Sequence, residues 1–318
     1  MFLIVNLNPA VDRIYHLKGF QLDKIHRTEN FMMQAGGKGI NVARATKVLK
    51  GNALVTGVLG GHAGRFISED LNHSGLKNDF SDVRMDSRTC IILIDTENST
   101  QTVINEDGPI LTSQEIDLFI QKFTSIIDKY SILVISGSLP ASLNRDVYSE
   151  IITIAKKNKV RNIVDTSKTA LKRAIAEKPF MLKPNIYEIA DALDDKTISQ
   201  EAMNQNYNPL VKACKSLVDE GTQNVAVSMG KLGALFHNRE KTFLVKAPEI
   251  KEINAVASGD SMTAAIAIEL DKRNSFEEAL LSGVAAGSAN ATVGGLKFSY
   301  EQYINIRKNL TVNYINEG

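Results

Sequence analysis

The sequence predicts an α/β fold built around a mainly parallel sheet, and three observations indicate it. Short runs of β-branched and aliphatic residues alternate with helical patterns along most of the 318 residues. Several of these runs are apolar at every position, as strands covered by helices on both faces must be. The composition, with 43% hydrophobic and 23% charged residues, is that of a globular protein rather than a disordered one.

The expected strands are the short apolar runs, and periodic apolar positions predict helices between and after them. The strands are expected at residues 2–7, 53–59, 132–136, 162–164, 180–183 and 225–228. The helices are expected near residues 40–50, 64–73, 113–130, 145–157, 186–192, 210–220, 260–272 and 275–293.

Two segments depart from this alternation. Residues 13–34 and 89–105 have strand character without a helix between the strands, and residues 95–100 are typical of a turn that joins antiparallel strands. We therefore expect a small second sheet made of sequence-distant pieces; a decorated edge of the main sheet is the alternative. Because a sheet of so few strands is marginal alone, it must rest on the mouth of a site or on a second subunit.

Charge and composition argue against several classes of function. The 37 Lys and Arg residues oppose 36 Asp and Glu residues, so bulk charge drives no binding to nucleic acid or to an anionic membrane. The long uncharged stretch at 279–296 is rich in small and polar residues, which suit close packing rather than a lipid bilayer. Cys90 and Cys214 form no paired motif, which favours a reducing, cytoplasmic setting.

The first candidate motif is a glycine turn that leads into an amphipathic helix. Residues 35–44 have the sequence AGGKGINVAR. Such a turn lets backbone amides approach a ligand closely, and the helix N-terminus adds a partial positive charge. It matches neither the Walker A sequence nor the dinucleotide fingerprint, and a purely structural turn is an equally good interpretation of the residues alone.

The second candidate motif precedes a helix of small residues near the C-terminus. Residues 254–261 have the sequence NAVASGDS. Small residues before a helix can expose several amide donors to a phosphate, and Asp260 can accept a proton from a substrate hydroxyl. Because Asp and Ser are preferred N-caps, helix capping is the alternative interpretation of Asp260.

Together the two motifs resemble the paired signatures of the PfkB (ribokinase-like) carbohydrate kinase family, which are Gly-Gly-Lys-Gly-x-Asn-x-Ala and Gly-Ala-Gly-Asp. Five further matches follow in the family's order: NLNPAVD at 6–12, SGSLP at 136–140, DTS at 165–167, KPNIYE at 183–188 and SMGKLGA at 228–234. The resemblance covers nearly the whole chain. It implies one kinase domain over residues 1–318, a ribokinase-like three-layer sandwich whose small sheet, about 13–34 and 89–105, is a lid.

Within the family, the chain looks like the hexose-phosphate branch, which comprises 1-phosphofructokinases and tagatose-6-phosphate kinases. The resemblance implies an ATP- and Mg²⁺-dependent phosphotransferase with an alcohol acceptor, fructose-1-phosphate being the favoured substrate. Tagatose-6-phosphate kinase is one alternative, and a sugar-phosphate sensor with weakened catalysis is another. Because the family's lid commonly pairs with that of a second subunit, we expect a homodimer.

The resemblance also assigns roles to individual residues. Asp260 is expected to be the general base, and the backbone amides of Ala257, Ser258 and Gly259 are expected to form an anion hole. The residues expected to bind the sugar hydroxyls are Asp12, Gly37, Lys38 and Asn41. The substrate phosphate is expected to bind Arg27 and Arg88, with Ser138 and Lys38 assisting.

The nucleotide end of the site is expected to come from three other places. Ser228, Gly230 and Gly233 match the turn that lies along ATP. Asn185 and Glu188 match a motif that holds Mg²⁺ largely through water, with an N-cap and an exposed glutamate as the alternative. The helix over 282–290 is expected to wall the adenine pocket with Ala286 and Asn290, and plain helix packing is the alternative.

One position departs from the family's pattern. Ala257 stands where the family usually has glycine, so it adds a Cβ where glycine permits a positive φ or a close approach. We expect either a lowered activity or a turn that adopts a compatible shape.

Overall fold

The main sheet lies at the centre of the molecule. A computed structural model of the chain describes residues 1–141, 143, 146–293 and 295–315. Within these residues the sheet has ten strands, in the order β14-β13-β12-β11-β10-β9-β8-β1-β4-β5. The strands are β1 (Phe2–Asn6), β4 (Ala53–Gly60), β5 (Ser81–Val83), β8 (Ile132–Ser136), β9 (Arg161–Asp165), β10 (Met181–Leu182), β11 (Asn224–Ser228), β12 (Ala234–Asn238), β13 (Thr242–Val245) and β14 (Val312–Tyr314).

The order of the strands defines where ligands bind. The strands from β5 to β11 run parallel, whereas β12, β13 and β14 form an antiparallel edge. From the central β1, the chain first adds β4 on one side and later β8 on the other. In open α/β sheets, ligands bind outside the carboxyl ends of the strands at such a switch point.

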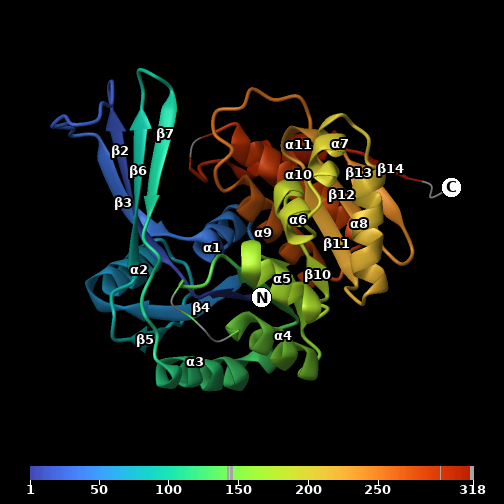
Figure 1. Cartoon of the computed structure of the whole chain (residues 1–318), viewed down its shortest axis with the longest axis horizontal. Helices are drawn as coiled ribbons and strands as arrows, with labels where there is room; N and C mark the ends of the chain where they lie inside the picture. The colour runs from blue at the N-terminus through green and yellow to red at the C-terminus, as the bar shows by residue number, and fades with distance from the viewer. Residues whose placement is uncertain (142, 144–145, 294, 316–318) are drawn as a thin grey trace.

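Helices cover both faces of this sheet (Figure 1). One face packs against α1 (Lys38–Val48), α2 (Gly61–His73), α9 (Ser258–Asp271), α10 (Phe276–Ala291) and α11 (Tyr300–Arg307). The other packs against α3 (Ser113–Ile126), α4 (Val147–Lys157), α5 (Lys168–Ala176), α6 (Ile186–Ala192), α7 (Thr197–Met203) and α8 (Asn208–Asp219). The layers are therefore helix, sheet and helix.

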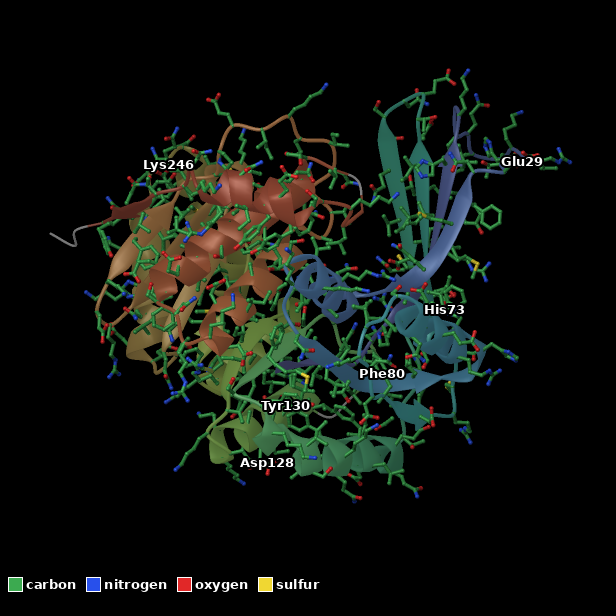
Figure 2. All side chains as sticks on the ribbon, turned by 180° about the vertical axis from the view of Figure 1, so that it is seen from behind. Glu29, His73, Phe80, Asp128, Tyr130 and Lys246 are labelled. Atoms are coloured by element: carbon green, nitrogen blue, oxygen red, sulfur yellow. The ribbon has the colours of Figure 1, made fainter. Side chains whose placement is uncertain are left out.

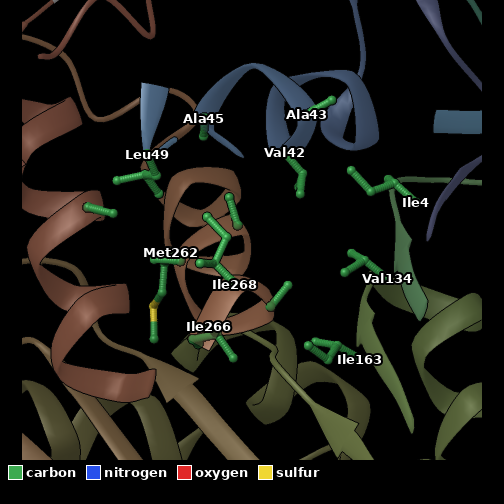
Figure 3. Close-up of a cluster of buried hydrophobic side chains, with 14 of the residues drawn as sticks. Ile4, Val42, Ala43, Ala45, Leu49, Val134, Ile163, Met262, Ile266 and Ile268 are labelled. Carbon is green, nitrogen blue, oxygen red and sulfur yellow. The ribbon is translucent and has the colours of Figure 1, made fainter. Parts of the chain in front are cut away.

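The pleat of the central strand divides its side chains between two cores. Ile4 of β1 belongs to the core beneath α1 and α9, whereas Leu3 and Val5 belong to the core beneath α3 and α4. Figure 3 shows the first of these cores, where Val42 of α1 and Ile266 of α9 lie over the sheet. This packing fixes the starts of α1 and α9 relative to the carboxyl ends of the strands.

A second, smaller sheet stands beside α1, away from the main sheet (Figure 1). It has the order β3-β2-β6-β7, with β2 (Ala10–Leu17), β3 (Phe31–Gly36), β6 (Arg88–Asp95) and β7 (Thr100–Asn105). The antiparallel turn expected at residues 95–100 joins β6 to β7. The second sheet of sequence-distant pieces is thus confirmed, although β2 begins at Ala10 rather than at residue 13.

The structure differs from the sequence prediction mainly in short elements. The strands β5, β12, β13 and β14 and the helices α5, α7 and α11 were not predicted. A helix of seven to nine residues has few turns and gives only a weak periodicity, although α6, of seven residues, was predicted. The helix expected to reach residue 130 ends at Ile126 and continues as a 3₁₀ turn, Ile127–Lys129. Position 145, the expected start of α4, lies outside the described residues.

None of the helices in the described residues is long and apolar enough to cross a membrane. The uncharged stretch at 279–296 forms most of α10, which packs closely along α9 inside the molecule.

Candidate active site

The starts of two helices meet at the carboxyl edge of the sheet. The Asn41 side chain in the first turn of α1 donates a hydrogen bond of 2.9 Å to Asp260 Oδ2 in the first turn of α9. No described side chain caps either helix. Backbone N–H groups in both first turns therefore point toward one region, and both helix dipoles favour an anion there.

Close approach explains two of the glycines in the first motif. A Cβ at Gly39 would lie 2.6 Å from Asn6 Cβ, so only glycine lets α1 begin directly on the end of β1. A Cβ at Gly36 would lie within 2.3 Å of the Asp12 carboxylate. Gly37, the N-cap of α1, has φ 110°, which favours glycine as well. The motif therefore brings the start of α1 against Asn6 and Asp12.

Asp260 has the properties of a general base. Its side chain is buried, with 4% of the residue exposed. Burial raises the pKa of Asp260 to about 6, although the positive charge of Lys38 opposes this effect. A carboxylate with a pKa just below neutrality is mostly ionised at pH 7 and accepts protons readily.

A buried carboxylate beside Asp260 holds two lysines. Asp165 accepts from Lys38 Nζ at 2.9 Å, lies 3.3 Å from Lys183 Nζ and accepts from the Thr263 hydroxyl at 2.7 Å. Burial alone raises the pKa of Asp165, but Lys183 and Lys38 together lower it to about 2. The pKa of Lys38 is raised, chiefly by Asp165. Positive charge is therefore fixed next to the candidate base.

The sequence analysis gave no role to Asp165 or Lys183. The signal was present, because Asp165 ends β9 and Lys183 directly follows β10, at the same edge of the sheet as Asn6. Parallel neighbours bring the residues at their carboxyl ends together. Residue type alone did not show that these two face Asp260.

Asp12 lies at the base of the smaller sheet. It is paired in register with Cys90 of β6 and Gln34 of β3. Burial raises the pKa of Asp12 to about 6, while Arg88 and Arg44 oppose the shift. This carboxylate is therefore near two guanidinium groups at the point where the smaller sheet meets α1.

Arg88 and Ser138 meet at Asn8. Arg88 Nε donates to the Asn8 carbonyl at 3.1 Å, and Asn8 Nδ2 donates to Ser138 Oγ at 3.3 Å. Two buried atoms nearby, Asn6 Nδ2 and Asn8 Oδ1, have no hydrogen-bond partner among the described residues. The structure thus brings Arg88, Ser138 and Asp12 to the end of β1.

Arg27 lies apart from these residues. It belongs to the exposed loop between β2 and β3, at the end of the smaller sheet opposite Arg88. Figure 2 labels the neighbouring Glu29, which lies at the outer tip of this sheet. Seven residue steps along β2 separate Ala10, beside Arg88, from Leu17, which corresponds to about 23 Å. Within one chain, Arg27 and Arg88 do not lie together.

Asn185 and Glu188 form a capping box at the start of α6. Asn185 Oδ1 accepts from the Glu188 N–H at 2.9 Å, and Glu188 Oε2 accepts from the Asn185 N–H at 2.8 Å. The N-cap of the alternative interpretation is therefore observed, but its exposed glutamate is not, because the Glu188 side chain is only 16% exposed. The other carboxylate oxygen, Glu188 Oε1, lies 3.8 Å from Lys38 Nζ and so faces the lysine cluster.

The glycine turn after β11 lies next to this helix start. Ser228 bridges to Asn185, and the Met229 N–H donates to the Gly233 carbonyl at 2.8 Å. Gly233 has φ 97°, and a Cβ there would lie 2.0 Å from the Val245 carbonyl oxygen. Gly230 has φ 58° with open space around it. The turn is thus tight on one side and open on the other.

Ala286 and Asn290 are fully buried in α10. Asn290 Nδ2 donates to the Val256 carbonyl at 2.7 Å and to Ser258 Oγ at 3.1 Å. Asn290 therefore holds the turn that precedes α9, which is the packing interpretation of this helix. Ala257 in that turn is left-handed, with φ 63° and ψ 8°, so the backbone keeps the shape that glycine permits.

These features are shared with a known family. Residues 5–302 match the pfkB family carbohydrate kinase model. The chain belongs to this family. Together with its relatives, the family makes the protein a phosphotransferase with an alcohol acceptor, and ATP is the phosphoryl donor that a sugar kinase of this family uses.

Relatives are similar over nearly the whole chain. The 1-phosphofructokinase of Borreliella burgdorferi is 36% identical over 93% of both chains. The 1-phosphofructokinase of Bacillus subtilis is 34% identical over 92% of both chains, and the tagatose-6-phosphate kinase of Staphylococcus epidermidis is 33% identical over 92% of both. The expected resemblance to the hexose-phosphate branch is confirmed.

Solved structures show the same fold. The phosphofructokinase-2 of Escherichia coli in complex with potassium has a TM-score of 0.89 at 28% identity, covering 96% of this chain and 98% of that one. The same enzyme in complex with fructose-6-phosphate has a TM-score of 0.86 at 27% identity, with the same coverage. The ribokinase-like α/β fold with a smaller separate sheet is confirmed.

Proposed function

We propose that this protein is an ATP-dependent kinase for a ketohexose phosphate and that it most readily converts fructose-1-phosphate to fructose-1,6-bisphosphate. The observation that carries the proposal is the placement of Asp260. A buried carboxylate with a raised pKa lies where two uncapped helix starts and two lysines meet. Such a site provides a base for an alcohol and positive charge for a phosphoryl group.

In the proposed reaction, the sugar hydroxyl oxygen forms a bond to the γ-phosphorus of ATP. The hydroxyl proton passes to the Asp260 carboxylate. The bond between the γ-phosphorus and its bridging oxygen breaks, and that oxygen leaves with its electron pair on ADP. The protein contributes positioning and electrostatic stabilisation and forms no covalent bond to the phosphoryl group.

The charge that develops on the phosphoryl group is stabilised by two sets of groups in this proposal. The backbone amides of Ala257, Ser258 and Gly259 form an anion hole at the start of α9, where no described side chain caps the helix. The Ser258 N–H donates to the Ala255 carbonyl at 3.1 Å and must leave this bond to contribute. Lys38 and Lys183 supply further positive charge, and Asp165 holds both. The left-handed Ala257 preserves the turn, so a sensor without turnover is not favoured.

Mg²⁺ fits this site through water and phosphate rather than through a protein cage. No group of three His, Cys, Asp or Glu side chains suited to a metal occurs in the described residues. Mg²⁺ usually keeps several waters and binds one or two carboxylates together with substrate phosphates. Glu188 Oε1, which the capping box does not use and which lies 3.8 Å from Lys38 Nζ, and Asn185 would hold such an ion, which would shield the charge of the ATP phosphates.

The sugar phosphate is proposed to bind between the smaller sheet and α1. Asp12, Gly37, Lys38 and Asn41 bind the hydroxyls, and Arg88 and Ser138 bind the phosphate. Arg27 remains proposed for the phosphate, although it is distant from Arg88 within one chain. Relatives named 1-phosphofructokinase support fructose-1-phosphate, and the relative named tagatose-6-phosphate kinase supports tagatose-6-phosphate as the second candidate.

ATP is proposed to lie along the turn of Ser228, Gly230 and Gly233, whose open side is at Gly230. Ala286 and Asn290 are proposed to form the buried wall behind the adenine. Asn290 acts there through Val256 and Ser258, which its side chain contacts.

The smaller sheet is proposed to be a lid that pairs with the lid of a second copy. Met32, Ile14, Ile92 and Val103 align in one row across its four strands. Met32 and Val103, at the two ends of this row, are 39% and 42% exposed. An apolar row on a thin sheet favours a partner surface. A cytoplasmic location is proposed because Cys90 and Cys214 are buried free thiols.

The test is an ADP-release assay with fructose-1-phosphate, fructose-6-phosphate and tagatose-6-phosphate at equal concentrations. One ketose phosphate is expected to have a kcat/KM at least about tenfold above the others, which corresponds to about 1.4 kcal/mol of discrimination. Arg88→Lys serves as a variant that keeps the positive charge of the proposed phosphate site but removes the guanidinium, which can bind a phosphate through two N–H groups. ADP release that depends on none of the three sugars would contradict the proposal.

A further inference from the structure

An ion pair between Arg44 and Asp70 binds the backbone of the edge strand β3 in the smaller sheet. Ala35 lies in β3, an edge strand, just before the glycine motif. Its N–H donates to Asp70 Oδ2 at 3.0 Å, and its carbonyl accepts from Arg44 Nη1 at 2.6 Å. Arg44 Nη2 donates to the same Asp70 oxygen at 2.7 Å. The two side chains together take the place of a neighbouring strand at this edge.

This ion pair joins three elements. Arg44 belongs to α1, Asp70 to α2 and Ala35 to the smaller sheet, so the hydrogen bonds among them connect two helices to this sheet. The Arg44 and Asp70 side chains are 16% and 25% exposed. A shielded pair with a forked guanidinium and backbone partners holds its geometry better than a surface ion pair does.

The position of the pair matters because the glycine motif follows it directly. Gly36 and Gly37 follow Ala35, and glycines add no side-chain packing of their own to fix the turn. The carboxylate of Asp12 lies against Gly36, where a Cβ would be 2.2 Å away. Burial raises the pKa of Asp12, and the charges of Arg88 and Arg44 oppose this shift, so the Arg44 guanidinium is within electrostatic reach of that carboxylate.

We propose that Arg44 and Asp70 are positioning residues that clamp the base of the smaller sheet, and that this clamp sets the position of Asp12 and Gly37 for the sugar phosphate. The inference deepens the proposed function and rests on it. Neither side chain is assigned a contact with substrate. The clamp acts through the backbone of Ala35.

Steady-state kinetics with the preferred sugar phosphate test the clamp. Asp70→Ala removes the acceptor shared by Ala35 and Arg44. Arg44→Lys keeps a charge but cannot hold Ala35 and Asp70 as a fork does. Both variants are expected to raise the KM for the sugar phosphate roughly tenfold, with the KM for ATP and kcat within about twofold of wild type. Asp70→Asn, which keeps an acceptor, is expected to fall between Asp70→Ala and wild type.

The ion pair between Arg307 and Glu278 provides a matched control. It joins α11 to α10 away from the sugar region, with side chains 19% and 53% exposed. Glu278→Ala is expected to leave the KM values for both substrates within about twofold of wild type. A sugar-phosphate KM unchanged by Asp70→Ala, or KM values for sugar phosphate and ATP that rise equally, would overturn the clamp.

Hydrogen exchange separates failure of the clamp from failure of the proposed function. In the ligand-free protein, the Ala35 amide is expected to exchange at least about tenfold faster in Asp70→Ala than in wild type or in Glu278→Ala. An unchanged rate would overturn the clamp, whatever the activity. If wild type releases no ADP with any sugar phosphate, the proposed function fails. The exchange rate of the Ala35 amide then decides alone whether the clamp exists.

Discussion

At the scale of single residues, the environment gives two neighbouring carboxylates opposite properties. Asp165 faces two lysines, which lower its pKa to about 2, whereas burial raises the pKa of Asp260 to about 6. Pairs of acids whose pKa values are pushed apart identify the group that exchanges a proton and the group that stays charged. Asp165 therefore anchors the lysines, and Asp260 is the acid that can take up a proton.

These values predict the pH dependence of activity. Asp260 must be ionised to accept a proton, and Asp12, whose pKa is also raised to about 6, is proposed to bind the sugar as a carboxylate. Both carboxylates are protonated as pH falls through about 6, and each protonation lowers kcat/KM about tenfold per pH unit. Well below pH 6, kcat/KM should therefore fall about a hundredfold per pH unit. Asp12→Asn should reduce this slope to about tenfold per unit.

Initial rates between pH 4.5 and 8 measure this slope, and circular dichroism confirms that the protein stays folded. A kcat/KM that is constant between pH 7 and pH 5 would rule out both assignments.

The left-handed conformation of Ala257 predicts that its replacement by glycine raises the free energy of unfolding. A left-handed alanine costs about 1–2 kcal/mol, and glycine relieves it at the expense of a more flexible unfolded chain. Ala257→Gly should therefore stabilise the protein by about 0.5–1 kcal/mol in urea unfolding. The control is Ala63→Gly within α2, which should cost about 1 kcal/mol. Equal losses in both variants would show that Ala257 is unstrained.

At the scale of elements, the start of α1 has no room for an added side chain, whereas the start of α9 has room for a methyl group. A Cβ at Gly39 meets Asn6 Cβ at 2.6 Å, whereas a Cβ at Gly259 meets only Lys183 Nζ, at 3.8 Å. Gly39→Ala should push α1 away from β1 and cost about 1–3 kcal/mol of unfolding free energy. Gly259→Ala should keep wild-type stability or exceed it, because alanine is the better helix former.

Activity should distinguish the same two variants. The methyl group of Gly259→Ala faces Lys183 in the space proposed for the phosphoryl group, so kcat should fall at least about tenfold in a stable protein. Urea unfolding and ADP release measure the two effects. A stable and fully active Gly259→Ala enzyme would contradict the placement of the anion hole.

Local patterns predicted the helix starts better than the contacts between them. Glycines before an amphipathic helix and small residues before Asp260 located the starts of α1 and α9. The contacts of Asp165 with Lys38 and Lys183 join three strands or helices, and no periodicity of one segment contains them. The same holds for Arg44 and Asp70, which lie on different helices. The crossover helix α5 between the parallel β9 and β10 was not predicted, although parallel neighbours need a long connection that is usually a helix.

At the scale of the whole molecule, alternation of strands and helices sufficed to predict a parallel sheet with two helical layers. The antiparallel edge of β12, β13 and β14 was not predictable in this way. No α-helix separates β11, β12 and β13 along the described residues 224–245, and β14 is a strand of three residues that follows α11. The second sheet was predictable as strand character without a helix. The distance between Arg27 and Arg88 depends on the length of β2, which only the structure shows.

The smaller sheet predicts the oligomeric state. The apolar row that ends at Val103 should be covered by a second copy, so light scattering should give twice the 34.9 kDa mass of the chain. Val103→Glu should give the monomer mass, because a charge in an apolar interface is costly. Ile110→Glu, at an exposed position outside the sheet, is the control and should stay dimeric. A monomeric wild type would contradict the pairing of lids.

The most direct test of the central claim is the rate of sugar-dependent ADP release by Asp260→Asn at saturating substrates. If Asp260 accepts the hydroxyl proton, kcat should fall by about 10²–10⁴-fold while the KM for ATP stays within about threefold of wild type. A kcat within twofold of wild type would contradict the account.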